Sequence, residues 1–144
     1  MISREEICQL IPHRDPFLWI DEVTELAENR LLARKLIPVE LDVFRGHYPG
    51  QPIFPGVLLC EAAMQAGAVL IATRGPTVEK PGQVPVATRM NNVKFRQMVK
   101  PGDVLDIEVE LTERLADAFF LAAKIRVAGK VAVQLDFACT LAKI

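Results

Sequence analysis

The sequence predicts an α+β fold in which a curled antiparallel β-sheet wraps around one long, buried helix. Two observations carry this prediction. Residues 56–74 form an apolar run of good helix formers with no internal proline. The segments after residue 83 alternate apolar and polar residues, as half-buried strands do. An apolar helix and an apolar sheet face bury each other when the sheet curls around the helix.

The first third of the chain predicts a short helix and a hairpin. Residues 3–6 form a capping-box pattern, so we expect a helix over Arg4–Leu10 that ends before Pro12. Strands are predicted over Phe17–Leu26 and Leu31–Ile37, with a short polar turn between them.

The long helix is predicted to begin at Gly56, with Pro55 in its first turn, and to stop at Gly75-Pro76. Small residues lie on several of its sides, which favours close packing of other backbone around it. A sheet that covers only one side leaves part of this helix bare, so we also expect the chain to self-associate.

The remainder predicts an exposed connection followed by a meander of strands in a single domain, residues 1–144. The expected features are a connection over 77–83, a strand over 84–97 with a bulge at Asn91-Asn92, a turn at Pro101-Gly102, strands over 105–112, 119–127 and 131–141, and a two-residue turn at Gly129-Lys130.

Composition excludes several classes of protein. The 144 residues are 51% hydrophobic and 24% charged with a net charge of −1, which gives no general attraction to nucleic acid. Three cysteines without ligand spacing and two histidines argue against a metal site and favour reduced thiols in the cytoplasm. The N-terminus lacks a signal peptide, and the apolar run is shorter than the ~20 residues of a membrane span.

The candidate chemistry lies on either side of the start of the long helix. His47 sits in a loop stiffened by three prolines, and Glu61 is the single acid within the apolar helix. Gln65 lies one turn after Glu61, so an amide–carboxylate pair can fix the acid. The free N–H groups of Gly56 and Val57 at the helix start suit a developing oxyanion. A base, an acid and oxyanion donors together fit the elimination of water next to a carbonyl.

The segment GHYPGQPIFPGVLLCEAAMQAG closely resembles the signature of the 3-hydroxyacyl-[acyl-carrier-protein] dehydratases of fatty-acid synthesis. The family pattern combines a GHFPG-type loop, a PGV helix start and an E-A-x-x-Q helix segment. Two further stretches, IPHRDPFLWIDEV and NNVKFRQMVKPGD, agree with it. The resemblance therefore extends over nearly the whole chain.

This resemblance implies a hot-dog fold that dimerises through its sheet and often assembles as a trimer of dimers. It implies that His47 of one subunit is the base and Glu61 of the other is the acid, with Gly56 and Val57 as oxyanion donors. No cofactor or metal is implied. The substrate is carried on the phosphopantetheine of acyl carrier protein. Gln65, Tyr48 and Phe54 are the further residues expected to bind substrate.

Residues 81–102 lack acidic side chains, so a basic patch is expected to dock the acidic carrier protein; its members are Arg89, Lys94, Arg96 and Lys100.

Departures from the family pattern at Phe54 and Met64 leave the acyl chain length open. His13, in the N-terminal motif, is expected to make a structural hydrogen bond. Two alternative functions are a thioesterase on the same fold and a non-catalytic acyl-binding subunit; the histidine loop argues against the first.

Overall fold

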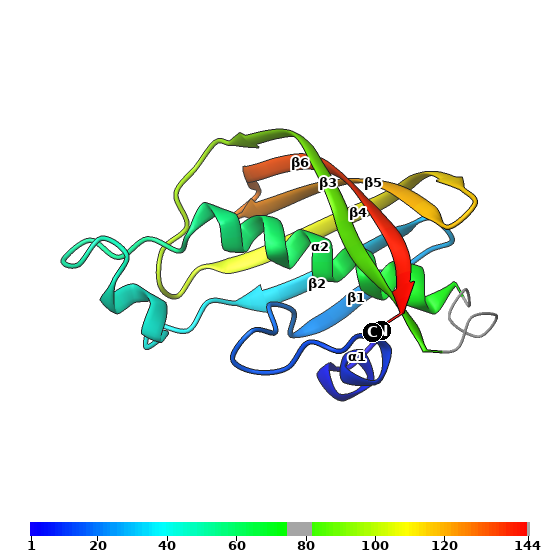
Figure 1. Cartoon of the computed structure of the whole chain (residues 1–144). Helices are drawn as coiled ribbons and strands as arrows, with labels where there is room; N and C mark the ends of the chain where they lie inside the picture. Colours follow the sequence, from blue (N-terminus) through cyan, green and yellow to red (C-terminus); the bar gives the residue numbers. More distant parts are fainter. Residues whose placement is uncertain (75–81, 144) are drawn as a thin grey trace.

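The structure, a computed structural model, describes residues 1–74 and 82–143 (Figure 1). Its elements are α1 (Arg4–Leu10), β1 (Glu22–Leu26), β2 (Arg30–Leu36), the 3₁₀ turn η1 (Asp42–Arg45), α2 (Gly56–Thr73), β3 (Gln83–Phe95), β4 (Val104–Leu115), β5 (Ala118–Val127) and β6 (Lys130–Lys143). The expected connection over 77–83 lies mostly outside the described residues, and Gln83 already belongs to β3.

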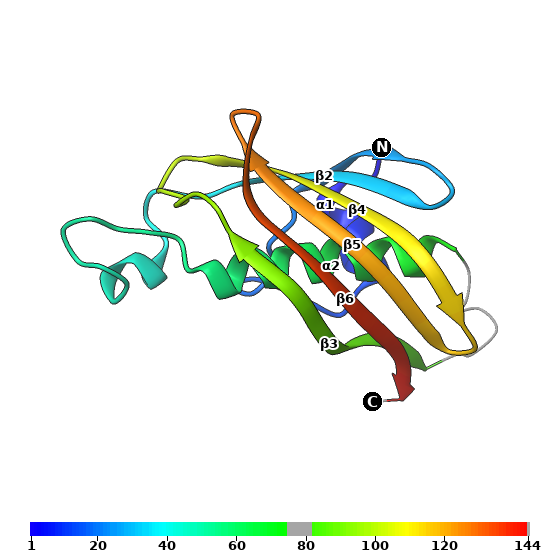
Figure 2. The ribbon, with the colours of Figure 1, turned by 90° about the horizontal axis from the view of Figure 1, so that it is seen from above.

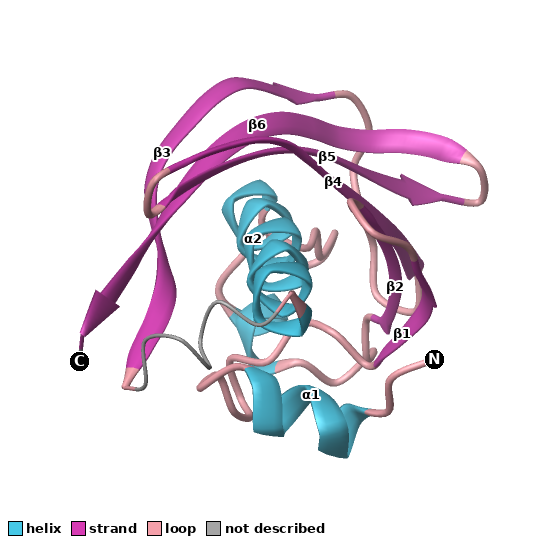
Figure 3. Cartoon of the chain, turned by 90° about the vertical axis from the view of Figure 1, so that its right-hand side faces the viewer, coloured by secondary structure: helices cyan, strands magenta, loops and turns pink. Residues whose placement is uncertain are grey.

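The described strands form one antiparallel sheet in the order β1-β2-β4-β5-β6-β3. Figure 2 looks onto this sheet, and Figure 3 looks along α2 and shows the sheet arching around it, with α1 on the open side. The predicted fold is therefore confirmed. By length and composition α2 resembles a membrane span, but 67% of it is buried inside the protein, so it is the core helix.

Close approach between α2 and the sheet explains the small residues of the helix. A Cβ atom added at Gly67 would lie 2.7 Å from the ring of Phe137 on β6 and 3.2 Å from Leu121 on β5. A side chain larger than hydrogen at this position would push the sheet outward. The helix is thus slim where the sheet lies against it.

The first predicted strand was too long, because β1 begins at Glu22 rather than at Phe17. The backbone of the preceding segment is bound by a side chain instead of a neighbouring strand. Gln65 of α2 accepts a hydrogen bond from the Trp19 N–H (2.8 Å) and donates one to the Phe17 carbonyl (2.8 Å). The buried side-chain amide of Gln65 therefore takes the place of the backbone of a neighbouring strand.

Two irregular positions were also predicted from sequence. The register of β3 against β6 shifts between Asn91 and Lys94, and Asn92 has a φ of 55°, so the predicted bulge is confirmed. The predicted turn at Gly129-Lys130 was wrong by one residue. Ala128 and Gly129 form it, both with positive φ, which matches the twist of a tight hairpin.

The β3 strand is less buried than its alternating sequence predicts. Pro85 is buried, but most of β3 beyond Val86 is exposed. The cause is position, since β3 ends the sheet and pairs within the described chain with β6 alone.

Candidate active site

His47 lies in the loop between η1 and α2, and one hydrogen bond fixes its ring. The Nδ1 atom is 2.7 Å from the carbonyl oxygen of Ile53. A carbonyl oxygen only accepts hydrogen bonds, so Nδ1 carries the proton of the neutral ring and the lone pair lies on Nε2. The ring of Tyr48, a residue with a φ of 58°, packs edge-on against His47 with centroids 4.7 Å apart. The loop thus presents a bare imidazole nitrogen.

The start of α2 lies on the same cavity as His47. The carbonyl of Pro55 accepts from the N–H groups of Leu58 (3.0 Å) and Leu59 (3.3 Å), which begins the helical ladder. The N–H groups of Gly56 and Val57 precede that ladder and carry the positive end of the helix dipole. This cavity has a volume of about 540 Å³, and His47, Tyr48, Gly56, Val57, Phe95 and Met98 are among the residues that line it.

Gly56 leaves room for an aromatic ring beside the start of α2. A Cβ atom there would lie 2.7 Å from the ring of Phe95, which follows the bulge of β3 and covers the helix start. The absence of a side chain lets this ring and the helix N-terminus share the wall of one cavity.

Glu61 lies farther along α2 in a second cavity of about 240 Å³. Its side chain is 22% exposed, and its Oε2 accepts a hydrogen bond of 3.0 Å from Gln65 Nε2. Because Gln65 also binds the backbone of Phe17 and Trp19, its amide is immobilised and in turn fixes the carboxylate. Met64, Ala68 and Cys139 are among the other residues of this cavity.

Within one chain, His47 and Glu61 line different cavities. The sequence expectation that the base of one subunit faces the acid of another therefore stays a prediction. The structure shows what each contributes: an imidazole with helix N–H donors in one hollow, and an anchored carboxyl group with apolar walls in the other.

Phe54 and Tyr48, both predicted to bind substrate, differ in environment. Phe54 is 1% exposed and packs edge-on against Trp19, at 5.3 Å, and against Phe44, at 6.5 Å. It lines the His47 cavity as part of the core. Tyr48 is largely exposed beside the same cavity. Phe54 can therefore act on cavity shape, whereas Tyr48 is accessible to a ligand.

The four basic residues predicted for docking are exposed on or just after β3. Arg96 also lines the His47 cavity and donates from Nε to Gln134 Oε1 (3.1 Å). The backbone N–H of Lys100 donates to Asp103 Oδ2. One member of the patch thus shares a cavity with the predicted base.

The structure places His13, which was expected to make a structural hydrogen bond, next to Glu61. Its Nε2 atom lies 3.6 Å from Oε2 of Glu61, and both residues line one cavity. Burial lowers the pKa of His13, opposed by the charge of Glu61. The signal was present in the sequence, since His13 belongs to the N-terminal motif of the resemblance.

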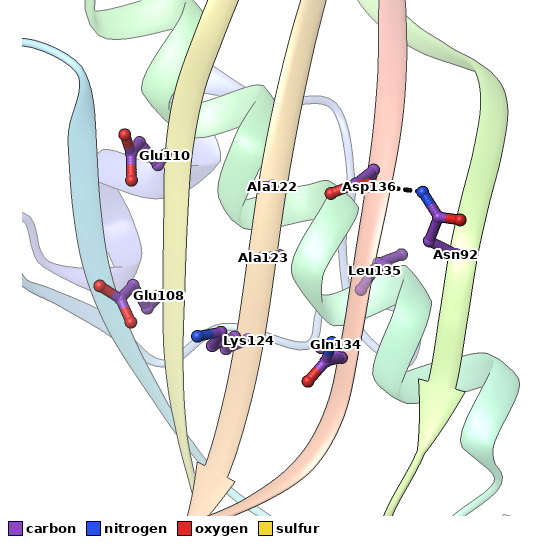
Figure 4. Close-up of a pocket in the computed structure, with 9 residues that line it drawn as sticks. All are labelled: Asn92, Glu108, Glu110, Ala122, Ala123, Lys124, Gln134, Leu135 and Asp136. Atoms are coloured by element: carbon purple, nitrogen blue, oxygen red, sulfur yellow. Dashed lines mark hydrogen bonds between the residues drawn. The ribbon is translucent and has the colours of Figure 1, made fainter.

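A third hollow, of about 180 Å³, lies on the outer face of the sheet, with α2 behind the strands (Figure 4). Glu108, Glu110 and Lys124 line it, and Asn92 donates to Asp136 across its edge (2.9 Å). It contains none of the predicted catalytic residues. Within 1–74 and 82–143, no three histidine, cysteine or acidic side chains converge as a metal site would require.

Comparison with known proteins identifies the family. A family model described as a FabA-like domain matches residues 11–136. The chain belongs to the FabA-like family. Among its FabA-like relatives, a 3-hydroxyacyl-[acyl-carrier-protein] dehydratase FabZ from Clostridium perfringens is 37% identical over 132 residues, covering 92% of this chain and 93% of the relative. A FabZ from Symbiobacterium thermophilum is 48% identical over 104 residues, covering 72% and 71%.

Solved structures share the fold of this FabA-like chain. The dehydratase heterocomplex ApeI:P from Xenorhabdus doucetiae matches with a TM-score of 0.80 at 18% identity, covering 95% of this chain and 91% of that one. A hypothetical thioesterase from Streptococcus pneumoniae, solved with coenzyme A, matches with a TM-score of 0.65 at 14% identity, covering 85% of each chain. At these identities the likeness concerns the fold alone.

Proposed function

We propose that this protein dehydrates a (3R)-hydroxyacyl thioester on acyl carrier protein to the trans-2-enoyl thioester during fatty-acid or related acyl-chain synthesis. One observation carries the proposal: His47, whose Nδ1 is held by the Ile53 carbonyl, lines the same cavity as Gly56 and Val57 at the α2 N-terminus. Such a cavity provides a base and an oxyanion site for one carbonyl compound. The FabZ relatives, at 37% and 48% identity, support the same reaction.

The proposed reaction uses backbone N–H groups and three side chains of the protein. The thioester carbonyl oxygen accepts hydrogen bonds from the Gly56 and Val57 N–H groups. Nε2 of His47 removes the α-proton, and the electron pair of that C–H bond forms the C=C bond as the β-hydroxyl leaves. Glu61 donates the proton that converts this hydroxyl to water, and Gln65 holds its carboxyl group in place.

The acyl chain is proposed to continue along α2 into the cavity of Glu61. Its apolar walls come from α2 and from the first half of β3, and the members that bound it are Met64, Ala68, Val84, Pro85 and Val86. Such a wall suits a hydrocarbon tail, whereas Tyr48 and Phe54 bound the cavity of the base. The thioester end then lies nearer the surface, where phosphopantetheine and the basic patch would meet the carrier protein in the cytoplasm.

A homodimer is proposed to complete the site, with His47 of one protomer facing Glu61 of its partner.

The two edges of the sheet differ. At β1, five residues long, Val23 exchanges two backbone hydrogen bonds with Ile2, which covers this edge. At β3, thirteen residues long, no further described strand pairs with the outer side. Exposed Val57, Phe95 and Met98 lie beside it. A long bare edge with apolar neighbours favours pairing with a second copy. A trimer of dimers is proposed as the larger assembly.

The test is to supply the purified protein with a 3-hydroxyacyl thioester and to monitor enoyl absorbance and free thiol. We expect enoyl product from wild type, and its loss by about 10²-fold or more in both His47→Ala and Glu61→Gln. Release of free thiol instead would identify a thioesterase. Absence of any product with carrier-protein and coenzyme A substrates of several lengths would favour a non-catalytic acyl-binding subunit.

A further inference from the structure

His13 is a half-buried titratable residue that the proposed reaction leaves without a role. It lies in the loop after α1, and its side chain is 26% exposed. Its Nε2 atom lies 3.6 Å from Oε2 of Glu61, slightly beyond hydrogen-bond distance. Contacts of this kind are often long in a free enzyme and shorten when substrate binds.

The backbone that carries His13 is held rigidly. The guanidinium of Arg14 donates to the carbonyls of Ile11 (2.8 Å), His13 (2.7 Å) and Cys8 (2.6 Å). Two of these charge-assisted hydrogen bonds tie the loop to the end of α1, and the third holds the carbonyl of His13 within the loop. Because the loop is fixed, the imidazole approaches Glu61 from a defined direction.

The surroundings of the ring select one neutral tautomer. Nδ1 of His13 is buried and has no hydrogen-bond partner within the described part of the chain. Nδ1 is unpaired whichever nitrogen carries the proton, whereas Nε2 has an acceptor nearby, Oε2 of Glu61, so the proton belongs on Nε2. The Nε2–H group then faces Glu61.

The charges around this ring favour the same neutral form. Burial lowers the pKa of His13, the charge of Arg14 lowers it further, and the charge of Glu61 opposes both. Cys139 of β6 also lines the cavity, and burial, with a further contribution from Glu61, raises the pKa of its thiol to about 12. His13 is thus a neutral N–H donor beside a neutral thiol.

We propose that His13 is a positioning residue for Glu61, which together with Gln65 presents N–H groups to Oε2 and so leaves Oε1 to carry the proton that is transferred. Gln65 approaches from one turn farther along α2 and His13 from the N-terminal loop. Two donors on one oxygen favour the carbonyl-like role for that oxygen, and the O–H group forms on the other. The inference rests on the proposed function only for the use of this proton in dehydration.

Two variants with amide side chains test whether the Nε2–H group of His13 acts as a donor to Glu61. The amide nitrogen of glutamine can replace Nε2 of His13, whereas that of asparagine corresponds to Nδ1 and cannot reach Glu61. We expect His13→Asn to lower kcat by about 10- to 100-fold with KM changed less than about twofold, since a misplaced acid slows the chemical step. We expect His13→Gln to retain kcat within about threefold of wild type. Both variants are polar, and their thermal midpoints report any loss of folding.

A measurement without substrate separates this inference from the proposed reaction. With carboxyl-¹³C-labelled glutamate, the Glu61 resonance is assigned through Glu61→Gln. We expect the chemical shift of the Glu61 carboxyl carbon to differ from wild type in His13→Asn and to match wild type in His13→Gln. If wild type forms no enoyl product but this pattern appears, the proposed function fails and the positioning role stands. Equal chemical shifts of Glu61 in the two variants, or equal losses of kcat, would overturn the role of His13.

Discussion

At the scale of single residues, hydrogen bonds decide which atoms are available for chemistry. The Ile53 carbonyl fixes the proton of His47 on Nδ1, and the Gln65 amide occupies Oε2 of Glu61. Each group that reacts in the proposed mechanism is thus oriented by a second group that does not react. Fixed orientation removes the entropy that a freely rotating acid or base would lose in the transition state.

Met64 gives the prediction that belongs to this scale. Its half-buried side chain lines the Glu61 cavity, where the acyl tail is proposed to lie. We expect Met64→Ala to enlarge this cavity and to raise kcat/KM for long relative to short 3-hydroxyacyl chains by about tenfold, the size of effect that a methylene or two has in an apolar pocket. Rates on carrier-protein substrates of graded length measure the ratio. An unchanged ratio would place the tail elsewhere.

At the scale of elements, α2 has two separate tasks. Its N-terminus provides the backbone donors of one cavity, and its face one to two turns later provides Glu61, Met64 and Gln65 to another. Another part of the helix surface lies against the sheet, where Gly67 allows contact with Phe137. The same helix can do both only because its sheet-facing residues are small.

Two glycine substitutions in α2 should therefore have unequal effects on stability. Gly67→Ala places a methyl group against Phe137, which is 2% exposed and cannot move aside. We expect a loss of about 1–2 kcal/mol in the free energy of unfolding, the net of overpacking and the better helix propensity of alanine. Gly56→Ala meets Phe95, which is 55% exposed and can rotate away. This control should lie within about 0.5 kcal/mol of wild type in denaturant titrations. Equal losses would contradict the packing argument.

Strand pairing gives a pH-dependent prediction. Glu108 of β4 accepts from Arg126 of β5 (2.9 Å) and from Arg30 of β2 (2.8 Å). The hydrogen bond from Arg126 is the largest cause that holds the pKa of Glu108 below its ordinary value of 4.5; burial opposes it, and the hydrogen bond and charge of Arg30 lower the pKa further. A carboxyl pKa lowered by folding stabilises the fold above pH 4.5, and this contribution is lost as the pH falls below that value.

We expect Glu108→Gln to lower the free energy of unfolding by about 1 kcal/mol at neutral pH. The difference from wild type should shrink as the pH falls below 4.5, because the wild-type carboxyl then becomes neutral as well. Urea titrations of both proteins across this range measure it. A difference that stays constant with pH would show that charge is not its cause.

At the scale of the whole molecule, the two sheet edges set how copies can associate. The β1 edge is covered by Ile2, whereas β3 is long and bare. His47 and Glu61 line different cavities of one chain, so a site that contains both requires a second protomer in the proposed arrangement.

Mixing two inactive variants tests this arrangement directly. We expect His47→Ala and Glu61→Gln to be inactive alone and to recover about a quarter of wild-type activity after equal amounts exchange subunits, because half of the dimers are mixed and each has one intact site of two. Dehydration rates before and after exchange measure the recovery, and the double variant mixed with itself is the control. No recovery after verified exchange would place base and acid in the same subunit.

Local sequence determined the elements and the candidate groups. The capping box, the proline-free apolar run and the period-two strands depend on neighbours in sequence, so α1, α2 and β4–β6 were predicted closely. Turn and strand ends were less well predicted. Phe17–Trp19 failed as the start of a strand because Gln65 of α2, far away in sequence, satisfies its backbone.

Only the tertiary structure decided the strand order, which edge stays bare, and which side chains share a cavity. These depend on contacts between residues distant in the chain, whose energies no local pattern contains. His47 and Glu61 could be chosen from sequence because their residue types and spacing indicate chemistry. The approach of His13 to Glu61 could not, since the loop after α1 meets α2 only when the sheet curls and the core closes.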